Sequence, residues 1–280
     1  MQDAHRATVA ARRAAVLADE AEALAFADLY AAAPQPLQAS LGLQVERFAG
    51  ATALLAPGLP SPMFNRVIGL GLESEAGDAE IEALIERYRR AGSANWWLHW
   101  NPFSAPEDMP ARLGRLGFTL PARRSWAKVL RGTEPAPQIT ADLKITAATD
   151  HQADEAMREV VTAFEMPPFM AGWLRSLHGR PGWRVYAVTD GEQTVGGGCL
   201  FTSGDIAWLG MGSVRASHRR RGGQRALMSR RITDAIEGGA RYIVTETGEP
   251  VGDEPNPSLG NMLRCGFVTV ASRLNFAAPA

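Results

Sequence analysis

The stretch that decides the fold runs from Val214 to Met228 and reads VRASHRRRGGQRALM. It follows an apolar segment, IAWLGMGSV, which is typical of a buried strand, and it leads into a segment with apolar residues at helical spacing. Three consecutive arginines, Arg219 to Arg221, stand just before two adjacent glycines. Free N–H groups and the positive end of the dipole make a helix start an anion site, and glycine lets the backbone approach a phosphate closely. The stretch therefore predicts a phosphate-binding loop at a helix start.

Two common phosphate-binding motifs do not fit this chain. No GxxxxGK[ST] string is present, so the loop is not that of a P-loop protein. GLGLES, which begins at Gly69, is close to a dinucleotide-binding GxGxxG, but acidic residues follow it and the third glycine is missing. We interpret GLGLES as a chance match.

The order of predicted elements and the string SVRASHRRRGGQRALM together resemble the GNAT acetyltransferases. The signature of that family is a strand ending in Val, a few residues, then R-x-x-G-x-G/A and a helix. Arg219, Gly222 and Gln224 stand at its positions here, although Gln224 replaces a small residue, so its side chain must point outward. NMLRCGF, residues 261–267, is similar to the family's last helix before Gly-Phe. The resemblance covers about residues 143 to 277.

The resemblance implies acetyl-CoA as the co-substrate, with no metal. It implies that the pantetheine arm pairs with the strand before the loop and that the loop holds the pyrophosphate, with weaker candidates around the last short helix. The implied CoA-binding residues are Gly212, Ser213, Val214, Arg219, Arg220, Arg221, Gly222, Gly223, Gln224, Arg225, Ala226, Asn256, Ser258 and Asn261.

The strand before the loop carries a second signal. Gly210 and Gly212 inside it fit a β-bulge or a close approach of a ligand. Strands that separate after a bulge leave an amide free to stabilise a thioester oxyanion. Met262 stands where many members of the family have a tyrosine acid, and methionine donates no proton. Another group or water then acts, or the thiolate leaves unprotonated, or catalysis is lost.

Candidate bases and acceptor contacts lie in two further segments. Glu246 and Glu249, in or just after the strand RYIVTET, are the candidate bases, although a solvated or hydrogen-bonded strand-end carboxylate is the favoured explanation of Glu246. Family likeness implies that the segment FEMPPFMAGW lines the acceptor site. Its candidates are Glu165, Met166, Phe169 and Trp173, and packing alone also explains the apolar ones.

The chain divides into two similar halves. RGTEPAPQITAD, with two prolines and a glycine, interrupts every periodicity near the middle. Each half reads strand, helix, strand, short helix, Gly-Phe, strand, and the second half in full reads β-α-α-β-β-β-α-β-α-β. We expect two tandem GNAT-like α/β (α+β) domains, each a mixed, mostly antiparallel sheet flanked by helices. They span residues 1–132 and 143–280, with 133–142 as the linker.

The first half lacks the cationic loop. LESEAGDAEIEAL stands at the equivalent place and carries acids at Glu73, Glu75, Asp78 and Glu80, which repel a pyrophosphate. Asp78 instead suits a helix N-cap and Glu80 a first turn. We interpret the first half as a degenerate copy that keeps the fold without binding CoA and walls one side of the acceptor pocket. The tryptophans of NWWLHW are expected in its core.

Composition limits the remaining function classes. The 280 residues are 46% apolar with a formal net charge of −1, so the chain as a whole is biased neither toward nucleic acid nor toward anionic membranes. Two cysteines without CxxC spacing predict buried free thiols in a reducing cytoplasm, and the five histidines lack metal-ligand spacing. No apolar run suits a signal peptide or a membrane span. We expect a cytoplasmic, bacterial protein, monomeric or homodimeric.

The leading hypothesis is an N-acetyltransferase that moves the acetyl group of acetyl-CoA to a primary amine of a small molecule or peptide. Direct attack in a ternary complex is the expected mechanism. Because Met262 replaces the usual acid, an acyl-CoA-binding sensor without turnover is the alternative. Nucleic-acid binding through HRRRGGQR ranks last, because the run is short and no aromatic residue interrupts it.

Overall fold

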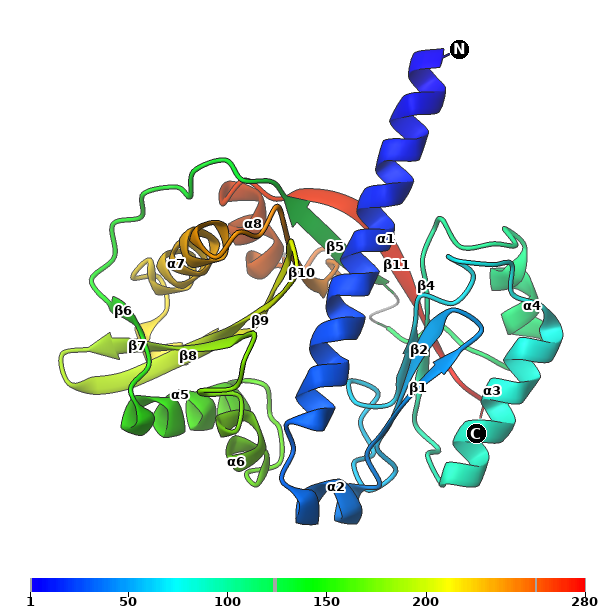
Figure 1. The fold of residues 1–280 in the computed structure, drawn as a ribbon, viewed down its shortest axis with the longest axis horizontal. Coiled ribbons are helices and arrows are strands. Elements are labelled where there is room, and N and C mark those ends of the chain that lie inside the picture. Colours follow the sequence, from blue (N-terminus) through cyan, green and yellow to red (C-terminus); the bar gives the residue numbers. More distant parts are fainter. Residues whose placement is uncertain (1, 123–124, 255, 280) are drawn as a thin grey trace.

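One twisted sheet of eleven strands runs through the computed structural model, which describes residues 2–122, 125–254 and 256–279 (Figure 1). In the part of the chain so described, the strand order is β1-β2-β3-β4-β11-β5-β10-β9-β8-β7-β6. Strands from the two halves of the sequence are therefore hydrogen-bonded into a single sheet.

The first half begins with two helices and continues with a small set of strands. Its elements are α1 (Gln2–Ala31), α2 (Gln35–Leu41), β1 (Gln44–Phe48), β2 (Ala51–Leu55), β3 (Arg66–Ile68), α3 (Asp78–Ala91), β4 (Trp97–Trp100), α4 (Met109–Arg115) and β5 (Ser125–Arg131). The predicted strand, helix, strand, short helix and final strand are all present.

The second half follows the predicted order from end to end. Its elements are β6 (Lys144–Ala147), α5 (Asp150–Ala163), α6 (Met170–Arg175), β7 (Trp183–Asp190), β8 (Gln193–Ser203), β9 (Ile206–Val214), the 3₁₀ turn η1 (Ala216–His218), α7 (Gly223–Glu237), β10 (Tyr242–Gly248), α8 (Pro257–Arg264) and β11 (Val268–Ala277). The mixed α/β fold class is confirmed.

The two halves exchange their last strands. β5, from the first half, pairs antiparallel with both β10 and β11 of the second half. In turn β11 pairs antiparallel with β4 of the first half. Each half thus completes the sheet of the other, and the boundary between the halves crosses the sheet at the β5–β11 pair.

Helices cover both faces of the sheet. On one face α1, α5 and α6 pack against residues such as Phe201, Trp208 and Leu54. On the other face α7 and α8 cover the second half, and α3 and α4 cover the first. The tryptophans Trp96 and Trp100 are buried in the first-half core, as predicted, and Trp97 is partly buried.

The sequence pattern did not predict the long helix α1. Its 30 residues are rich in alanine, the strongest helix former, but most of its apolar residues are alanines and they give no marked stripe. Figure 1 shows α1 standing between the two halves, and it contacts β9, β10, β5 and β11. The helix therefore lies across the exchanged strands.

A cluster of buried charges fixes α1 to the sheet. The Glu22 carboxylate accepts ion pairs from Arg66 on β3 at 2.9 Å, Lys128 on β5 at 2.8 Å and Arg273 on β11 at 2.5 Å. Burial alone would raise the pKa of Glu22, but these three cations outweigh it and hold that pKa well below its usual value. The neighbouring Asp19 binds Arg273 at 2.9 Å.

Replacement of this carboxylate is expected to cost much of the stability. Glu22→Gln leaves three buried cations short of one negative charge, so we expect a loss of about 3–5 kcal/mol in the free energy of unfolding. Because the folded pKa of Glu22 is depressed, its stabilisation is present at neutral pH and is lost as the pH falls through that folded value. The variant should therefore also lose stability less steeply in acid than the unmodified protein.

Chemical denaturation at several pH values would measure both effects. Glu20→Gln is the matched control, because Glu20 lies on the same helix and is exposed. Its effect should stay within about 0.5 kcal/mol. Equal effects of the two substitutions would contradict a central role for Glu22.

Candidate active site

The site begins where two parallel strands separate. β9 and β10 pair in register at Ile206, Ala207 and Trp208. Beyond this register side chains bridge the two strands: the Thr245 hydroxyl donates to the Leu209 carbonyl at 2.7 Å, and the Trp208 indole donates to Glu246 at 3.1 Å. The strands continue apart to Val214 and Gly248, which opens a slot through the sheet.

A β-bulge lies on the β9 side of this slot, as the glycines predicted. Gly210 pairs with Cys199 and Ser213 with Gly197, so Met211 and Gly212 together oppose a single residue of β8. Met211 has a φ of 56°, which turns the backbone out of the strand. Gly210 has no room for a side chain, because a Cβ there would lie 1.8 Å from the Trp208 ring.

The predicted phosphate loop connects the end of β9 to α7. α7 begins at Gly223 after the N-cap Gly222, whose φ is 77°, and no side chain caps the first turn. Its first N–H groups are therefore free to bind an anion. A cavity of about 780 Å³ lies in front of them. It is lined by Val214, Ala216, Ser217, His218, Arg219, Arg220, Gly222, Gly223, Gln224, Arg225, Pro257 and Asn261.

The arginines of the loop differ in their partners. Arg221 binds Asp190 at 2.6 Å and lies 3.7 Å from Asp142, so its charge ties the loop to the β7–β8 turn. Arg219 and Arg220 are exposed, and within the described ranges neither they nor Arg225 form an ion pair. The cavity is thus lined by arginines whose charges are not neutralised, and Arg221 lies outside that lining.

The equivalent helix start in the first half is acidic. The Gly77 N–H donates to the Glu80 carboxylate at 2.9 Å, and Asp78 lies beside it in the first turn, so negative charge disfavours an anion there. The N-cap is Gly77, so the expectation of Asp78 at that position is wrong; Asp78 is the first helical residue and lies 3.4 Å from Arg112. Glu80 lies in the first turn, as predicted.

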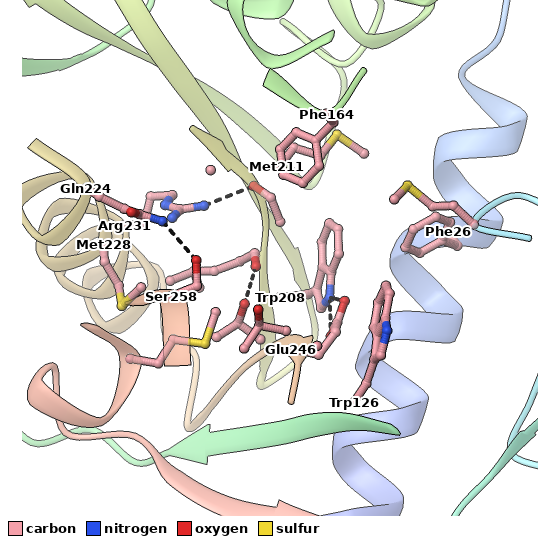
Figure 2. Close-up of a pocket in the computed structure, with 18 of the residues that line it drawn as sticks. Phe26, Trp126, Phe164, Trp208, Met211, Gln224, Met228, Arg231, Glu246 and Ser258 are labelled. Atoms are coloured by element: carbon pink, nitrogen blue, oxygen red, sulfur yellow. Dashed lines mark hydrogen bonds between the residues drawn. The ribbon is translucent and has the colours of Figure 1, made fainter. Parts of the chain in front are cut away.

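A second cavity, of about 250 Å³, fills the slot between β9 and β10 (Figure 2). On one side it is lined by Phe26 on α1, Phe64, Trp126 on β5 and Trp208, so the first half contributes to its wall. On the other side lie residues of α7 and α8: Gln224, Met228, Arg231, Ser258 and Met262. Gln224 lines both cavities, so the phosphate loop and the slot meet at this residue.

Of the two candidate bases, only Glu246 lines the slot. Its side chain is 6% exposed and accepts hydrogen bonds from Lys128 and from the Trp208 indole, each at 3.1 Å. Glu249 instead accepts hydrogen bonds from the hydroxyls of Ser125, at the start of β5, and Ser272, in the middle of β11.

The four predicted acceptor contacts separate in the structure. Met166 lines the slot, and so does its neighbour Phe164, which sequence reasoning did not select. Glu165 and Phe169 are exposed and lie outside the lining of the slot. Trp173 is buried between α6 and α1, where its indole donates to the Leu29 carbonyl at 2.8 Å.

Polar residues of α8 form hydrogen bonds with the Gln224 side chain, which lines both cavities. The Gln224 amide donates to the Ser258 hydroxyl at 3.3 Å and accepts from Asn261 at 3.5 Å, so the side chain points toward α8 and not into solvent. Asn256 caps α8 by accepting from the Ser258 N–H at 2.9 Å. Met262 is buried in the wall of the slot.

Comparison with solved structures finds a similar fold in several proteins. A GCN5-related N-acetyltransferase from Kribbella flavida matches with a TM-score of 0.59 at 15% identity, over 88% of this chain and 94% of that one. A GCN5-related N-acetyltransferase from Sphaerobacter thermophilus matches with a TM-score of 0.59 at 16% identity, over 81% and 79%. A tandem GNAT protein from the clavulanic acid biosynthesis pathway matches with a TM-score of 0.56 at 17% identity, over 81% and 78%.

The chain has the tandem GNAT fold. Neither the family models nor the curated proteins yield a match to it. Among the residues described, no group of three or more His, Cys, Asp or Glu side chains in this GNAT fold could hold a metal ion. Within the same ranges, no helix has both the length and the apolar character that crossing a membrane requires.

The starts of α7 and α3 are expected to differ in anion binding: the α7 start should bind pyrophosphate and the α3 start should not. Replacing Arg219 and Arg220 together by Ala should weaken binding of inorganic pyrophosphate at least about tenfold, since charge-assisted hydrogen bonds to phosphate are lost. Replacing Glu73 and Glu75 by Gln should change pyrophosphate binding little, because Asp78 and Glu80 keep the α3 start acidic. Calorimetry on both double variants is the measurement, and equal losses would contradict a single anion site.

Proposed function

We propose that the protein is a GNAT-type N-acetyltransferase in which the second half alone holds acetyl-CoA. One observation carries this proposal: the uncapped start of α7 leads past Gln224 into the slot where β9 and β10 separate. The free N–H groups and unpaired arginines suit a pyrophosphate, and the bulged edge of β9 suits pairing with an extended pantetheine arm. The fold shared with N-acetyltransferases supports the same activity.

The two halves then have different tasks within one site. We assign the co-substrate to residues 143–280 and the support of the acceptor side to residues 1–132. Phe26, Phe64 and Trp126 belong to the first half and line the slot opposite α7. The exchanged strands β5 and β11 hold these two sides in fixed relation.

The proposed reaction needs a neutral amine next to the thioester. The amine nitrogen attacks the carbonyl carbon, so a C–N bond forms while the C–S bond breaks. The nitrogen loses a proton and the departing sulfur takes one up, which gives an N-acetyl amide and CoA. Holding both substrates in one slot supplies much of the rate by proximity.

Glu246 is suited to the amine side of this reaction. Its nearly buried carboxylate faces the slot and is held by Lys128 and Trp208. A carboxylate so placed can orient the amine by accepting its N–H bonds and can take its proton during attack. Glu249, bound to two serine hydroxyls outside the slot, is less suited to this role.

The lining of the slot favours an acceptor with an apolar body. Phe26, Phe64, Phe164, Trp126 and Trp208 provide aromatic surface, and the volume of about 250 Å³ fits a small molecule. Such a surface favours an arylalkylamine-like primary amine over a polyamine or an aminoglycoside.

The activity can be tested directly. The protein with acetyl-CoA and a panel of amines should release free thiol and form an N-acetyl product detectable by mass spectrometry. The panel should include arylalkylamines, polyamines, amino acids and aminoglycosides. Tight acetyl-CoA binding without turnover across the whole panel would contradict the proposal and favour an acyl-CoA sensor, for which Met262 is the argument.

The base assignment predicts unequal losses. Glu246→Gln removes the carboxylate from the slot and should lower kcat on the order of 100-fold. Glu249→Gln should lower it much less, and Glu237→Gln, at the exposed end of α7, serves as the control. A larger loss in Glu249→Gln would assign the base to that residue instead.

Gln224, which lines both cavities, gives a separate prediction. Gln224→Ala should lower the KM for acetyl-CoA by about two- to fivefold or leave it unchanged. The side chain lies in the lining of both cavities, so its removal leaves more room there, and its two hydrogen bonds are long, at 3.3 and 3.5 Å. Steady-state kinetics with acetyl-CoA as the varied substrate measures this, and a KM increase above tenfold would show that Gln224 itself binds the co-substrate.

A further inference from the structure

One buried arginine on α7 faces the slot without an acidic partner. Arg231 is 3% exposed and lines the slot cavity. Its Nη1 donates to the carbonyls of Cys199 at 3.1 Å and Gly210 at 3.0 Å, and its Nε to the Leu227 carbonyl at 3.3 Å. Throughout the described part of the chain no carboxylate forms an ion pair with it, and its Nη2 makes no hydrogen bond.

Glycines on the sheet make room for this guanidinium. A Cβ on Gly212 would lie 2.8 Å from Nη2, and a Cβ on Gly198 would lie 3.2 Å from Nη1. The guanidinium therefore lies directly against the bulged segment of β9, with its free Nη2 beside Gly212. Buried cations normally pair with an acid, so an unpaired one in a cavity wall indicates an anionic partner that is not part of the chain.

Charge stays on Arg231 at neutral pH. Burial lowers the pKa of its guanidinium to about 10, which is still far above 7. Glu246, in contrast, shares its charge with Lys128 and lies on the acceptor side of the slot. Figure 2 shows Arg231 with Gln224 and Met228 on one side and Glu246 with Trp126 on the other.

This separation matches the charges that the proposed reaction develops. Attack by a neutral amine makes the nitrogen positive and leaves negative charge first on the carbonyl oxygen and then on the departing sulfur. The path from the phosphate loop enters the slot at Gln224, on the Arg231 side. Met262 lines the same side of the slot and donates no proton, so it cannot protonate the departing sulfur as a tyrosine at this position would.

We propose that Arg231 stabilises the negative charge on the CoA sulfur, so that CoA leaves as a thiolate without a protein acid. The C–S bond breaks with its electron pair on sulfur, and the thiolate takes its proton from solvent after release. Thiols are acidic enough, with a pKa of about 8.5 for cysteine, that a thiolate is a tolerable leaving group, and a fixed cation in an apolar cavity improves it further. The inference rests on the proposed function.

The pKa of the thiol of bound CoA tests the proposal without turnover. It can be followed by the ultraviolet absorbance of the thiolate while the complex of the full-length protein with CoA is titrated. In the unmodified protein the pKa of the bound thiol should lie about one unit or more below that of free CoA. In Arg231→Met it should rise to the free value or above, and in Arg231→Lys it should lie between the two.

Kinetics should follow the same order. Arg231→Met is expected to lose kcat on the order of 100-fold and Arg231→Lys on the order of tenfold, with KM for acetyl-CoA changed less than kcat. Arg230→Met is the matched control, because Arg230 precedes it on α7, is half exposed and pairs with Asp234 away from the slot. That control should leave both the thiol pKa and kcat within about twofold.

Three outcomes would overturn the assignment. One is an unmodified protein whose bound CoA thiol titrates like free CoA, a result that needs no variant to fold. Another is an Arg231→Met protein that binds CoA with an unchanged thiol pKa. The third is a preference of tenfold or more for succinyl-CoA over acetyl-CoA that Arg231→Met abolishes, because the arginine would then bind an acyl carboxylate. Failure of the unmodified protein to bind CoA at all would instead refute the proposed function itself.

Discussion

Glu22 holds together elements that are distant in sequence, and most of the architecture depends on it. A carboxylate on α1 binds cations from β3, β5 and β11, and Lys128 passes the interaction on to Glu246 in β10. Removing such charges from water is costly, and only mutual pairing offsets that cost. The buried acids Asp19, Glu22 and Glu246 match the buried cations Arg66, Lys128 and Arg273 in number. Because Glu246 also faces the slot, the same cluster that seats α1 fixes a side chain of the candidate site.

Local sequence pattern predicted the elements well and their pairing poorly. The strand, loop and helix around Gly222 and the bulge at Gly210–Gly212 follow from residue types that act within a few positions, so they were predictable. The pairing of β10 with β5 depends instead on contacts between residues more than 100 positions apart in the sequence. The alternation of apolar and polar residues in β5 does not indicate which strands lie beside it. α1 was missed because small alanines carry no strong periodicity.

Arg231 shows why part of the site escaped prediction. From sequence alone, an arginine on a helix is expected to be exposed to solvent. Arg231 is buried because Gly198 and Gly212, which face it on the sheet, leave room for its guanidinium. Phe26 and Trp126 were missed for a related reason. Phe26 lies on the long helix α1 and Trp126 on the exchanged strand β5, and neither element was expected beside the slot. Glu246 could be selected because it lies on the strand that follows the loop and α7, and Met166 because the resemblance to the GNAT acetyltransferases pointed to its segment.

The exchange of β5 and β11 also limits the sequence in which the strands can pair during folding. β5 is synthesised before either of its neighbours, so its hydrogen-bonding edges stay open until β10 and β11 follow. β4 likewise waits for β11, which lies about 170 residues later in the sequence, before its second edge is covered. Open strand edges invite pairing with other chains. The second edge of β4 is thus covered only when the last strand of the chain closes the sheet of the first half.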